Sequence, residues 1–312
     1  MSEKEIDISV IIPAYNEGKN LPTLINNIFE TFNKSKFNNN FEVIVVNDGS
    51  QDKTEQIVND ILKIKKKLTL INLKENVGKA YALDCGLKNS KGSIVATIDA
   101  DLQYKAEDLI KMLDVIESGT DLVNGKRIKR QDIFFTKIFS KLYNLILRVL
   151  FRTQIKDFFS GIKVFKKEIY DLMGYNGLSR FVIFFSKKYN FKISEIEIEH
   201  NKRLHGNTAY SFFDRIILSL KDMFTLLICV ALEKKGVYQI KQVVLVLYFL
   251  TFLSILFGKF FFNYFNFEDI FYLLTSLIAL SILNIIIQSF LRSKEKKIED
   301  SKIIIRSIKN SN

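Results

Sequence analysis

Two long apolar runs in the last quarter of the chain constrain its fold more than any other feature. Residues 243–262 contain a single charged side chain, Lys259, and residues 270–291 contain none. A helix of about 20 apolar residues is long enough to cross the hydrocarbon layer of a bilayer, which is roughly 30 Å thick. We therefore predict two transmembrane helices, at about 243–262 and 270–291. Two buried helices of a soluble domain are the alternative.

The charges beside these runs predict their orientation. The short link between them, 263–269, has acidic residues and no basic ones. Loops near membrane helices carry an excess of lysine and arginine on the cytoplasmic side. We therefore expect an integral membrane protein whose preceding domain and both termini are cytoplasmic. The basic residues on the two outer flanks are Lys234, Lys235, Lys241, Arg292, Lys294, Lys296 and Lys297.

The chain divides by composition around these helices. Residues 1–130 alternate short apolar runs with polar segments, as one half of a folded domain would. Residues 131–235 are expected to form its second half, with amphipathic helices at a membrane surface. Residues 236–292 contain the transmembrane helices, and residues 293–312 form a solvated basic tail that touches lipid headgroups.

A basic amphipathic helix is predicted at 133–153. Apolar side chains fill most of this segment, and a polar stripe runs along it. This pattern is typical of a helix that lies on an anionic membrane, and a packed structural helix is the alternative. Residues 212–232 are a second candidate of the same kind. The stripe consists of Lys137, Lys141, Asn144, Arg148 and Arg152.

The net charge of +12 fits three kinds of partner, namely nucleic acid, an anionic membrane and a phosphate-bearing substrate. Basic residues concentrate between 126 and 152 and again after 291, beside apolar segments and without a recognisable nucleic-acid-binding module. We therefore predict membrane and phosphate partners and no nucleic acid. Cys85 and Cys229 lack a metal-ligand spacing, which argues against a zinc site and a disulfide framework.

Strands and helices alternate in the first part of the chain. Apolar runs at 8–12, 41–46, 68–72 and 94–98 predict strands, and segments with helical spacing lie between them, including one at 54–62. This order gives a mostly parallel sheet flanked by helices. Because ligands bind such sheets at the carboxyl ends of the strands, the polar residues that follow each strand are candidate site residues.

Acidic residues follow two of these strands. Asp99, Ala100 and Asp101 come after the fourth strand, with Gln103 close behind. Two carboxylates in one turn can hold a hard divalent cation that neutralises a diphosphate, and two helix-capping aspartates are the alternative. Asp48 comes after the second strand, where it could accept hydrogen bonds from a nucleobase or a ribose.

A glycine-containing loop precedes the third helix. Gly78 allows the backbone to approach a ligand, and Lys79 or the helix N-terminus could lie near phosphate, whereas a plain loop is the alternative. No Gly-X-Gly-X-X-Gly follows the first strand, and no Walker A loop occurs. Dinucleotide-dependent oxidoreductases and P-loop enzymes therefore lose support.

Together these motifs resemble family 2 glycosyltransferases of the GT-A fold. The resemblance is greatest to the branch of dolichol-phosphate mannosyltransferases and polyprenyl-phosphate glucosyltransferases. It covers about residues 6–230 and implies a Rossmann-like, mixed, mostly parallel α/β sheet with a nucleotide-sugar-binding half before an acceptor-binding half. The segments that carry it are 10–17 (VIIPAYNE), 46–50 (VNDGS), 76–79 (NVGK) and 99–103 (DADLQ).

The resemblance also implies roles for individual residues. The nucleotide sugar would be bound by Pro13, Tyr15, Glu17, Asp48, Gly78, Lys79, Asp99, Ala100 and Asp101. The metal, Mg²⁺ or Mn²⁺, would be held by Asp99, Asp101 and Gln103. The acceptor phosphate would meet Arg127, Arg130, Ser160 and Arg203, and the catalytic residues would be Asp101, Arg127 and Arg203. One departure is Tyr104-Lys105, which stands where the family usually has prolines.

The reaction implied is the inverting transfer of a hexose from a nucleotide-diphosphate sugar, of the UDP-glucose or GDP-mannose type, to dolichyl or undecaprenyl phosphate at the cytoplasmic membrane face. The alternatives are a membrane-anchored family member with a non-lipid acceptor, and a non-catalytic membrane scaffold. Processive polysaccharide synthases carry a Gln-X-X-Arg-Trp segment, and this chain has no Trp. A two-helix anchor is also compatible with a homo-oligomer.

Overall fold

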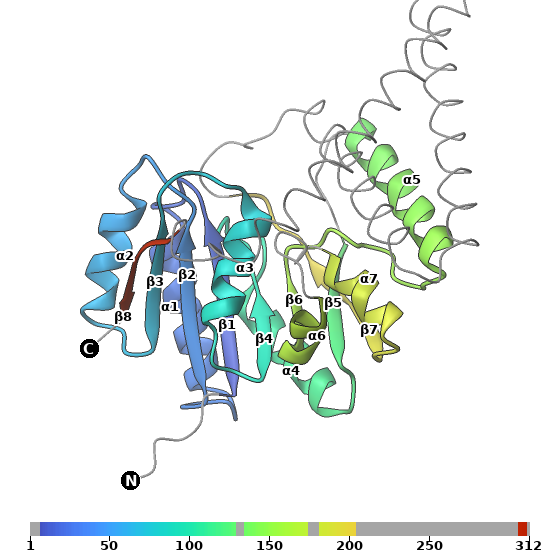
Figure 1. The fold of residues 1–312 in the computed structure, drawn as a ribbon, viewed down its shortest axis with the longest axis horizontal. Coiled ribbons are helices and arrows are strands. Elements are labelled where there is room, and N and C mark those ends of the chain that lie inside the picture. Colours follow the sequence, from blue (N-terminus) through green and yellow to red (C-terminus); the bar gives the residue numbers. More distant parts are fainter. Residues whose placement is uncertain (1–6, 129–133, 174–180, 204–304, 311–312) are drawn as a thin grey trace, which may run out of the picture. The chain divides into compact units, whose positions relative to one another are not determined.

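An eight-stranded mixed sheet is the centre of the fold (Figure 1). The computed structural model describes residues 7–128, 134–173, 181–203 and 305–310, all of which belong to one of the two compact units of the chain. The strand order is β7-β5-β6-β4-β1-β2-β3-β8. The strands are β1 (Ile8–Ala14), β2 (Phe41–Asn47), β3 (Leu68–Leu73), β4 (Ile94–Thr97), β5 (Leu122–Ile128), β6 (Lys163–Lys166), β7 (Ile193–Glu199) and β8 (Ile305–Asn310).

Four neighbouring strands, β4, β1, β2 and β3, run parallel, so their carboxyl ends meet at one edge of the sheet. β6 runs antiparallel to both β4 and β5, and β7 runs parallel to β5. The beginning of β6 and the ends of β5 and β7 therefore arrive at the same edge. The predicted α/β, mixed and mostly parallel sheet is confirmed.

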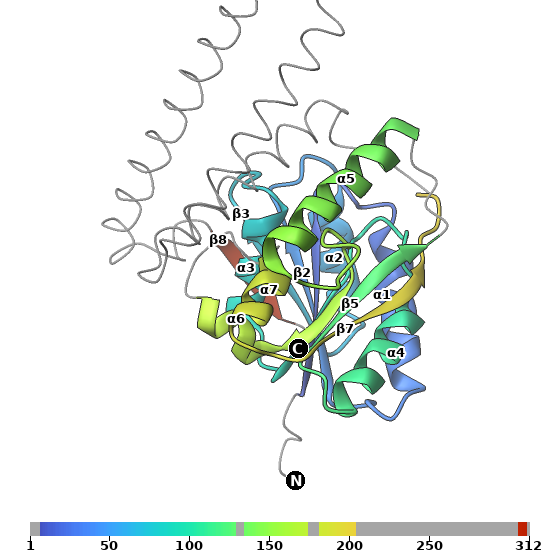
Figure 2. The same ribbon diagram turned by 90° about the vertical axis from the view of Figure 1, so that its right-hand side faces the viewer.

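Helices cover both faces of the sheet (Figure 2). α1, α2 and α4 pack on one face, because the apolar side chains of Val10 and Ile12 in β1 point to that side. α3 packs on the opposite face, where Gly86 lets it approach Ile11: a Cβ at position 86 would lie 2.5 Å from that side chain. α6 and α7 pack on each other and on β5, β6 and β7. These helices are α1 (Leu21–Asn33), α2 (Thr54–Leu62), α3 (Lys79–Asn89), α4 (Ala106–Glu117), α6 (Lys167–Met173) and α7 (Val182–Lys188).

The helix predicted at 133–153 is observed as α5 (Phe134–Phe151). Tyr143 and Leu147 are buried, whereas Leu145 and Val149 are exposed. Asn144 does not belong to a solvated polar stripe, because it is buried and its side-chain oxygen accepts a hydrogen bond from the Phe158 N–H at 3.1 Å. α5 thus supports the loop that precedes β6 and also presents apolar side chains to its surroundings.

The C-terminal residues 305–310 form a strand, although the sequence analysis expected a solvated tail. β8 pairs antiparallel with β3, with Ile71 opposite Ile308. Asn72 of β3 also donates its side-chain amide to the Ser307 hydroxyl at 3.1 Å. An uncovered edge strand leaves a row of unpaired N–H and C=O groups, and β8 satisfies those of β3.

The predicted transmembrane segments 243–262 and 270–291, and the amphipathic segment 212–232, lie outside the described residues. Among the helices that are described, none is both long and apolar enough to span a bilayer.

Candidate active site

The polar clusters predicted from the sequence meet at the carboxyl edge of the parallel strands. Pro13 lies near the end of β1, Asp48 follows β2, and Asp99 and Asp101 follow β4. β6 begins at Lys163, which pairs with Thr97 of β4, so the preceding residues lie beside the loop that holds Asp99. The two halves predicted for the domain therefore meet at this edge.

Asp99 forms an ion pair with Lys79, the first residue of α3. Its side chain is 26% exposed. Burial alone would raise the pKa of this carboxyl, but the positive charge of Lys79, with smaller effects from Lys163 and Arg127, holds the pKa below its usual value. The Asp99 carboxylate is therefore ionised and in contact with the Lys79 ammonium group.

Asp101 forms the second ion pair of the site, with Arg203. The guanidinium donates to Oδ2 of Asp101 at 2.8 Å, and the Asp101 side chain is 8% exposed. Glu17 lies close to both residues. Its pKa is raised, mainly by burial and also by the nearby Asp101 and Asp99, and the positive charge of Arg203 opposes this rise. Five of the predicted residues thus gather at one place, in two ion pairs and one further carboxylate.

Asp48 holds the loop that leads into α3. Its two carboxylate oxygens accept hydrogen bonds from the N–H groups of Val77 at 2.8 Å and Gly78 at 3.0 Å. Burial raises the pKa of Asp48, and these two bonds oppose the rise. Gly78 has φ of +93°, a conformation that favours glycine. The structure shows how Asp48 positions Lys79, and contact with a nucleotide stays a prediction.

Gln103 joins the Asp99–Gln103 loop to the segment that carries Arg203. Its side-chain amide donates to the Asn201 carbonyl at 3.0 Å, and the Asn201 N–H donates to the Gln103 carbonyl at 3.0 Å. The Gln103 N–H donates to Asp101 at 3.2 Å. These bonds hold Leu102 at φ of +62°, which a branched side chain rarely adopts. Its contacts thus indicate that Gln103 positions the loop, and metal ligation stays a prediction.

Arg127, predicted to bind the acceptor phosphate, makes a forked ion pair with Asp157. Its Nε and Nη2 donate to the two carboxylate oxygens at 2.7 and 2.8 Å. The side chains are 15% and 6% exposed. Sequence reasoning missed Asp157, although it stands three residues before Ser160, which was predicted to meet the acceptor phosphate. The pair fixes this loop to β5, and the interaction of Arg127 with phosphate stays a prediction.

Gly161, which follows Ser160, packs directly against Asp99. A Cβ added at Gly161 would contact Cγ and both oxygens of that carboxylate, the farthest of them at 2.7 Å. Lys163 is buried nearby and donates to the Ser160 carbonyl. Burial, together with the positive charge of Lys79, lowers the pKa of Lys163 to about 7. The segment that contains Ser160 and Gly161 is thus in contact with the acidic motif.

The remaining predicted residues have simple placements. Tyr15 is half-buried in the loop after β1, and Ala100 is buried between the two aspartates. Arg130 lies outside the described residues. No group of three or more metal-binding side chains converges within the ranges that the structure describes. Two aspartates nevertheless suit Mg²⁺ or Mn²⁺, because such ions are commonly held by one or two carboxylates together with substrate phosphates and water.

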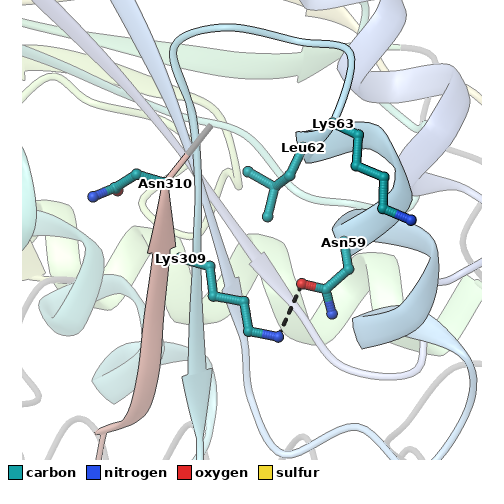
Figure 3. A pocket seen from close by; sticks show the side chains of 5 residues that line it. All are labelled: Asn59, Leu62, Lys63, Lys309 and Asn310. Carbon is teal, nitrogen blue, oxygen red and sulfur yellow. Dashed lines mark hydrogen bonds between the residues drawn. The ribbon is translucent and has the colours of Figure 1, made fainter. Parts of the chain in front are cut away.

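An open depression of about 510 Å³ lies at the other end of the sheet and not at this site (Figure 3). It is lined by Asn59, Leu62 and Lys63 of α2 and the helix end, and by Lys309 and Asn310 of β8. Lys309 donates to Asn59 across it at 3.1 Å. None of the predicted site residues lines it.

A family model described as glycosyl transferase family 2 matches residues 9–184, which include the acidic edge of the sheet and the Ser160–Lys163 segment. The chain belongs to this family. It is a glycosyltransferase, as the motifs predicted.

Curated relatives agree with this assignment. An undecaprenyl-phosphate 4-deoxy-4-formamido-L-arabinose transferase from Aeromonas hydrophila is 30% identical over 224 residues, which cover 71% of this chain and 67% of that protein. The protein of the same name from Proteus mirabilis is 30% identical over 229 residues, 73% of this chain and 68% of that one.

Solved structures agree on the fold. Glucosyl-3-phosphoglycerate synthase from Mycobacterium tuberculosis, in complex with Mn²⁺, UDP and glucosyl-3-phosphoglycerate, has a TM-score of 0.55 and 20% identity. The match covers 71% of this chain and 78% of that one. The predicted GT-A fold is therefore confirmed for the described part of the chain.

Proposed function

We propose that this glycosyltransferase moves a sugar from a nucleotide-diphosphate sugar to the phosphate of a polyprenyl phosphate, at the cytoplasmic face of a membrane. The observation that carries the proposal is the contact between the two halves of the site. Asp99 of the acidic motif packs against Gly161, and Lys79 and Arg203 form ion pairs with Asp99 and Asp101, respectively. Donor and acceptor phosphates would meet there.

The donor side would use the residues at the ends of β1, β2 and β4. Asp99 and Asp101 would hold Mg²⁺ or Mn²⁺, which when bound supplies positive charge to the diphosphate leaving group. Lys79 lies at the N-terminus of α3, where the helix dipole also favours an anion. Arg203 adds a guanidinium suited to phosphate oxygens. Asp48 would keep the Gly78 turn in place during binding.

The acceptor explains why the site needs no evident general base. A phosphomonoester has a second pKa of about 6, so it is mostly a dianion at neutral pH and can attack the anomeric carbon directly. A single in-line attack would invert the configuration at that carbon. Ser160 and the basic residues near it would hold the acceptor phosphate, and the apolar side chains exposed on α5 would face lipid.

The names of the relatives support the acceptor and leave the sugar open. The two relatives are named for undecaprenyl phosphate and for 4-deoxy-4-formamido-L-arabinose, which is not a hexose. We propose a hexose donor of the UDP-glucose or GDP-mannose type, and the formamido-arabinose donor is the direct competitor. The two transmembrane helices predicted from the sequence would keep the site near the lipid headgroups.

One experiment tests donor, acceptor and metal together. The full chain in membranes is incubated with each nucleotide sugar, undecaprenyl or dolichyl phosphate, and Mn²⁺ or Mg²⁺, and the lipid product is identified by mass spectrometry. We expect a glycosyl-phosphate lipid that disappears with a chelator and in Asp99→Ala or Asp101→Ala. Asp60→Ala is the matched control, because Asp60 pairs with Lys63 on the surface of α2.

The outcomes are separable. Transfer only to a water-soluble acceptor would replace the lipid part of the proposal with the non-lipid alternative. Full turnover of the Asp101→Ala variant, or full turnover in the presence of the chelator, would contradict the roles given to the acidic pair.

A further inference from the structure

Tyr104 is a buried side chain at the active site to which no role has yet been given. It is 4% exposed and follows Gln103. Its hydroxyl accepts a hydrogen bond from the Gly161 N–H at 2.9 Å and lies 3.4 Å from the Ser160 hydroxyl oxygen. Its ring meets His200 edge to face, with the ring centroids 5.2 Å apart. Tyr104 therefore contacts both the acceptor segment and the end of β7.

These contacts affect the site because Gly161 is packed on Asp99. The space between this glycine and the carboxylate is too small for a Cβ, so the position of the 160–161 peptide sets where Ser160 lies relative to the acidic pair. The Gly161 N–H is buried, and the tyrosine hydroxyl is a partner for it. A buried amide that loses its partner is costly, so the hydroxyl fixes the position of this peptide.

The place of Tyr104 in the chain explains how it reaches the Ser160–Gly161 segment. Tyr104 and Lys105 directly precede α4, which begins at Ala106. Tyr104 is directed inward from this position and reaches a segment 57 residues later in the chain. Burial raises its pKa to about 12, so the phenol stays protonated at neutral pH. A neutral hydroxyl can accept from Gly161 and donate to Ser160 together.

We propose that Tyr104 is a positioning residue for the acceptor: its hydroxyl holds the Ser160–Gly161 peptide against Asp99, so that an acceptor phosphate bound at Ser160 faces the donor diphosphate held at the acidic pair. This inference rests on the proposed function, since it assigns the acceptor side of the same site. It differs from a purely structural role because the donor side should not depend on the hydroxyl.

The test is Tyr104→Phe, which removes one oxygen atom, with Tyr170→Phe as the control. Tyr170 is a buried tyrosine of α6, 9% exposed, outside the site. In the full-length protein we expect kcat/KM for undecaprenyl phosphate to fall by roughly 10-fold in Tyr104→Phe, because a displacement of well under 1 Å at a reacting group already lowers the rate. Affinity for UDP with Mn²⁺, measured by calorimetry, should stay within about twofold of wild type. Tyr170→Phe should change neither quantity.

A thermal unfolding scan of both variants separates positioning from folding. The inference is supported if Tyr104→Phe loses acceptor kcat/KM while its unfolding temperature stays close to that of Tyr170→Phe. The effects of Tyr104→Phe and Ser160→Ala should also be non-additive, because both act through the same peptide.

Three results would overturn it. Tyr104→Phe could retain acceptor kinetics within about twofold of wild type. It could instead weaken UDP binding and acceptor use equally, which would indicate a general structural role. Wild-type protein that forms no lipid product would refute the proposed function and this inference with it, whereas an active wild type with an unimpaired Tyr104→Phe variant refutes the inference alone.

Discussion

Replacing Gly161 with alanine measures how tightly the acceptor segment is packed on Asp99. The new Cβ would meet three atoms of the Asp99 carboxylate, and even the farthest, Oδ1, would be 2.7 Å away. Ordinary contacts begin at 3.4 Å, so the carboxylate or the segment must move by roughly 1 Å. A misplacement of about 1 Å at a reacting centre can cost about 100-fold in rate. Overpacking of this kind also costs about 1–3 kcal/mol of folding free energy.

The assay is the rate of lipid glycosylation at saturating acceptor, together with thermal unfolding. Gly119→Ala is the control, because Gly119 has φ of +97° and no atoms within 4 Å of an added Cβ. It should lose about 1 kcal/mol of stability from backbone strain and keep its turnover. We expect Gly161→Ala to lose activity far beyond the loss in this control. Wild-type turnover in Gly161→Ala would refute the packing of this segment on Asp99 in the active enzyme.

Three further predictions follow from the described contacts. Asp157→Asn should lower the free energy of unfolding by about 3 kcal/mol, because it removes the carboxylate that pairs with the buried Arg127. Glu197→Gln breaks the exposed pair with Lys126 and should cause no measurable loss of stability. Equal losses of stability in the two variants would contradict the view that the buried pair matters more than the exposed one. Lys163 has its pKa lowered from 10.5 to about 7, so the folded lysine disfavours its proton and wild-type stability should rise between pH 7 and 10.5. Lys163→Met should therefore unfold at a higher temperature than wild type at pH 7, with a smaller advantage at pH 9, and a constant difference would argue against a neutral lysine. Removal of residues 305–312 should lower the unfolding temperature and speed hydrogen exchange in β3, whereas removal of 311–312 alone should do neither. Unchanged exchange in β3 after removal of 305–312 would show that β8 does not cover β3 in solution.

The first half of the fold follows from local patterns in the sequence. The four parallel strands are short apolar runs that are buried on both faces, and the structure places them within a residue or two of the predicted ranges. Later strands lack this signal. β5 includes glycine and basic residues, and β6 has only four residues. β8 was missed because its partner is β3, more than 200 residues earlier, and no local pattern encodes such a pairing.

The site residues also divide into those that a local sequence pattern reveals and those that depend on distant segments. The acidic motif, the Gly78 turn and the basic residues were found from the sequence, because each is a local cluster at the end of a strand. Their partners were not, since they come from other segments. Arg127 was expected to face a phosphate, yet Asp157 binds it from 30 residues away. Tyr104 was noted only as a departure, and its bond to Gly161 required the folded chain.

The place of β8 in the sheet restricts how the chain can pass through a membrane. Arg203, which follows β7, and Ile305, the first residue of β8, both belong to this unit, and the predicted transmembrane segments lie between them in the sequence. Because both points belong to a unit built on one sheet, they must lie on the same side of any bilayer. The two transmembrane helices predicted from the sequence would meet this condition, whereas a single one or three would not. An insertion or deletion that made the number of transmembrane helices odd would have to separate β8 from β3.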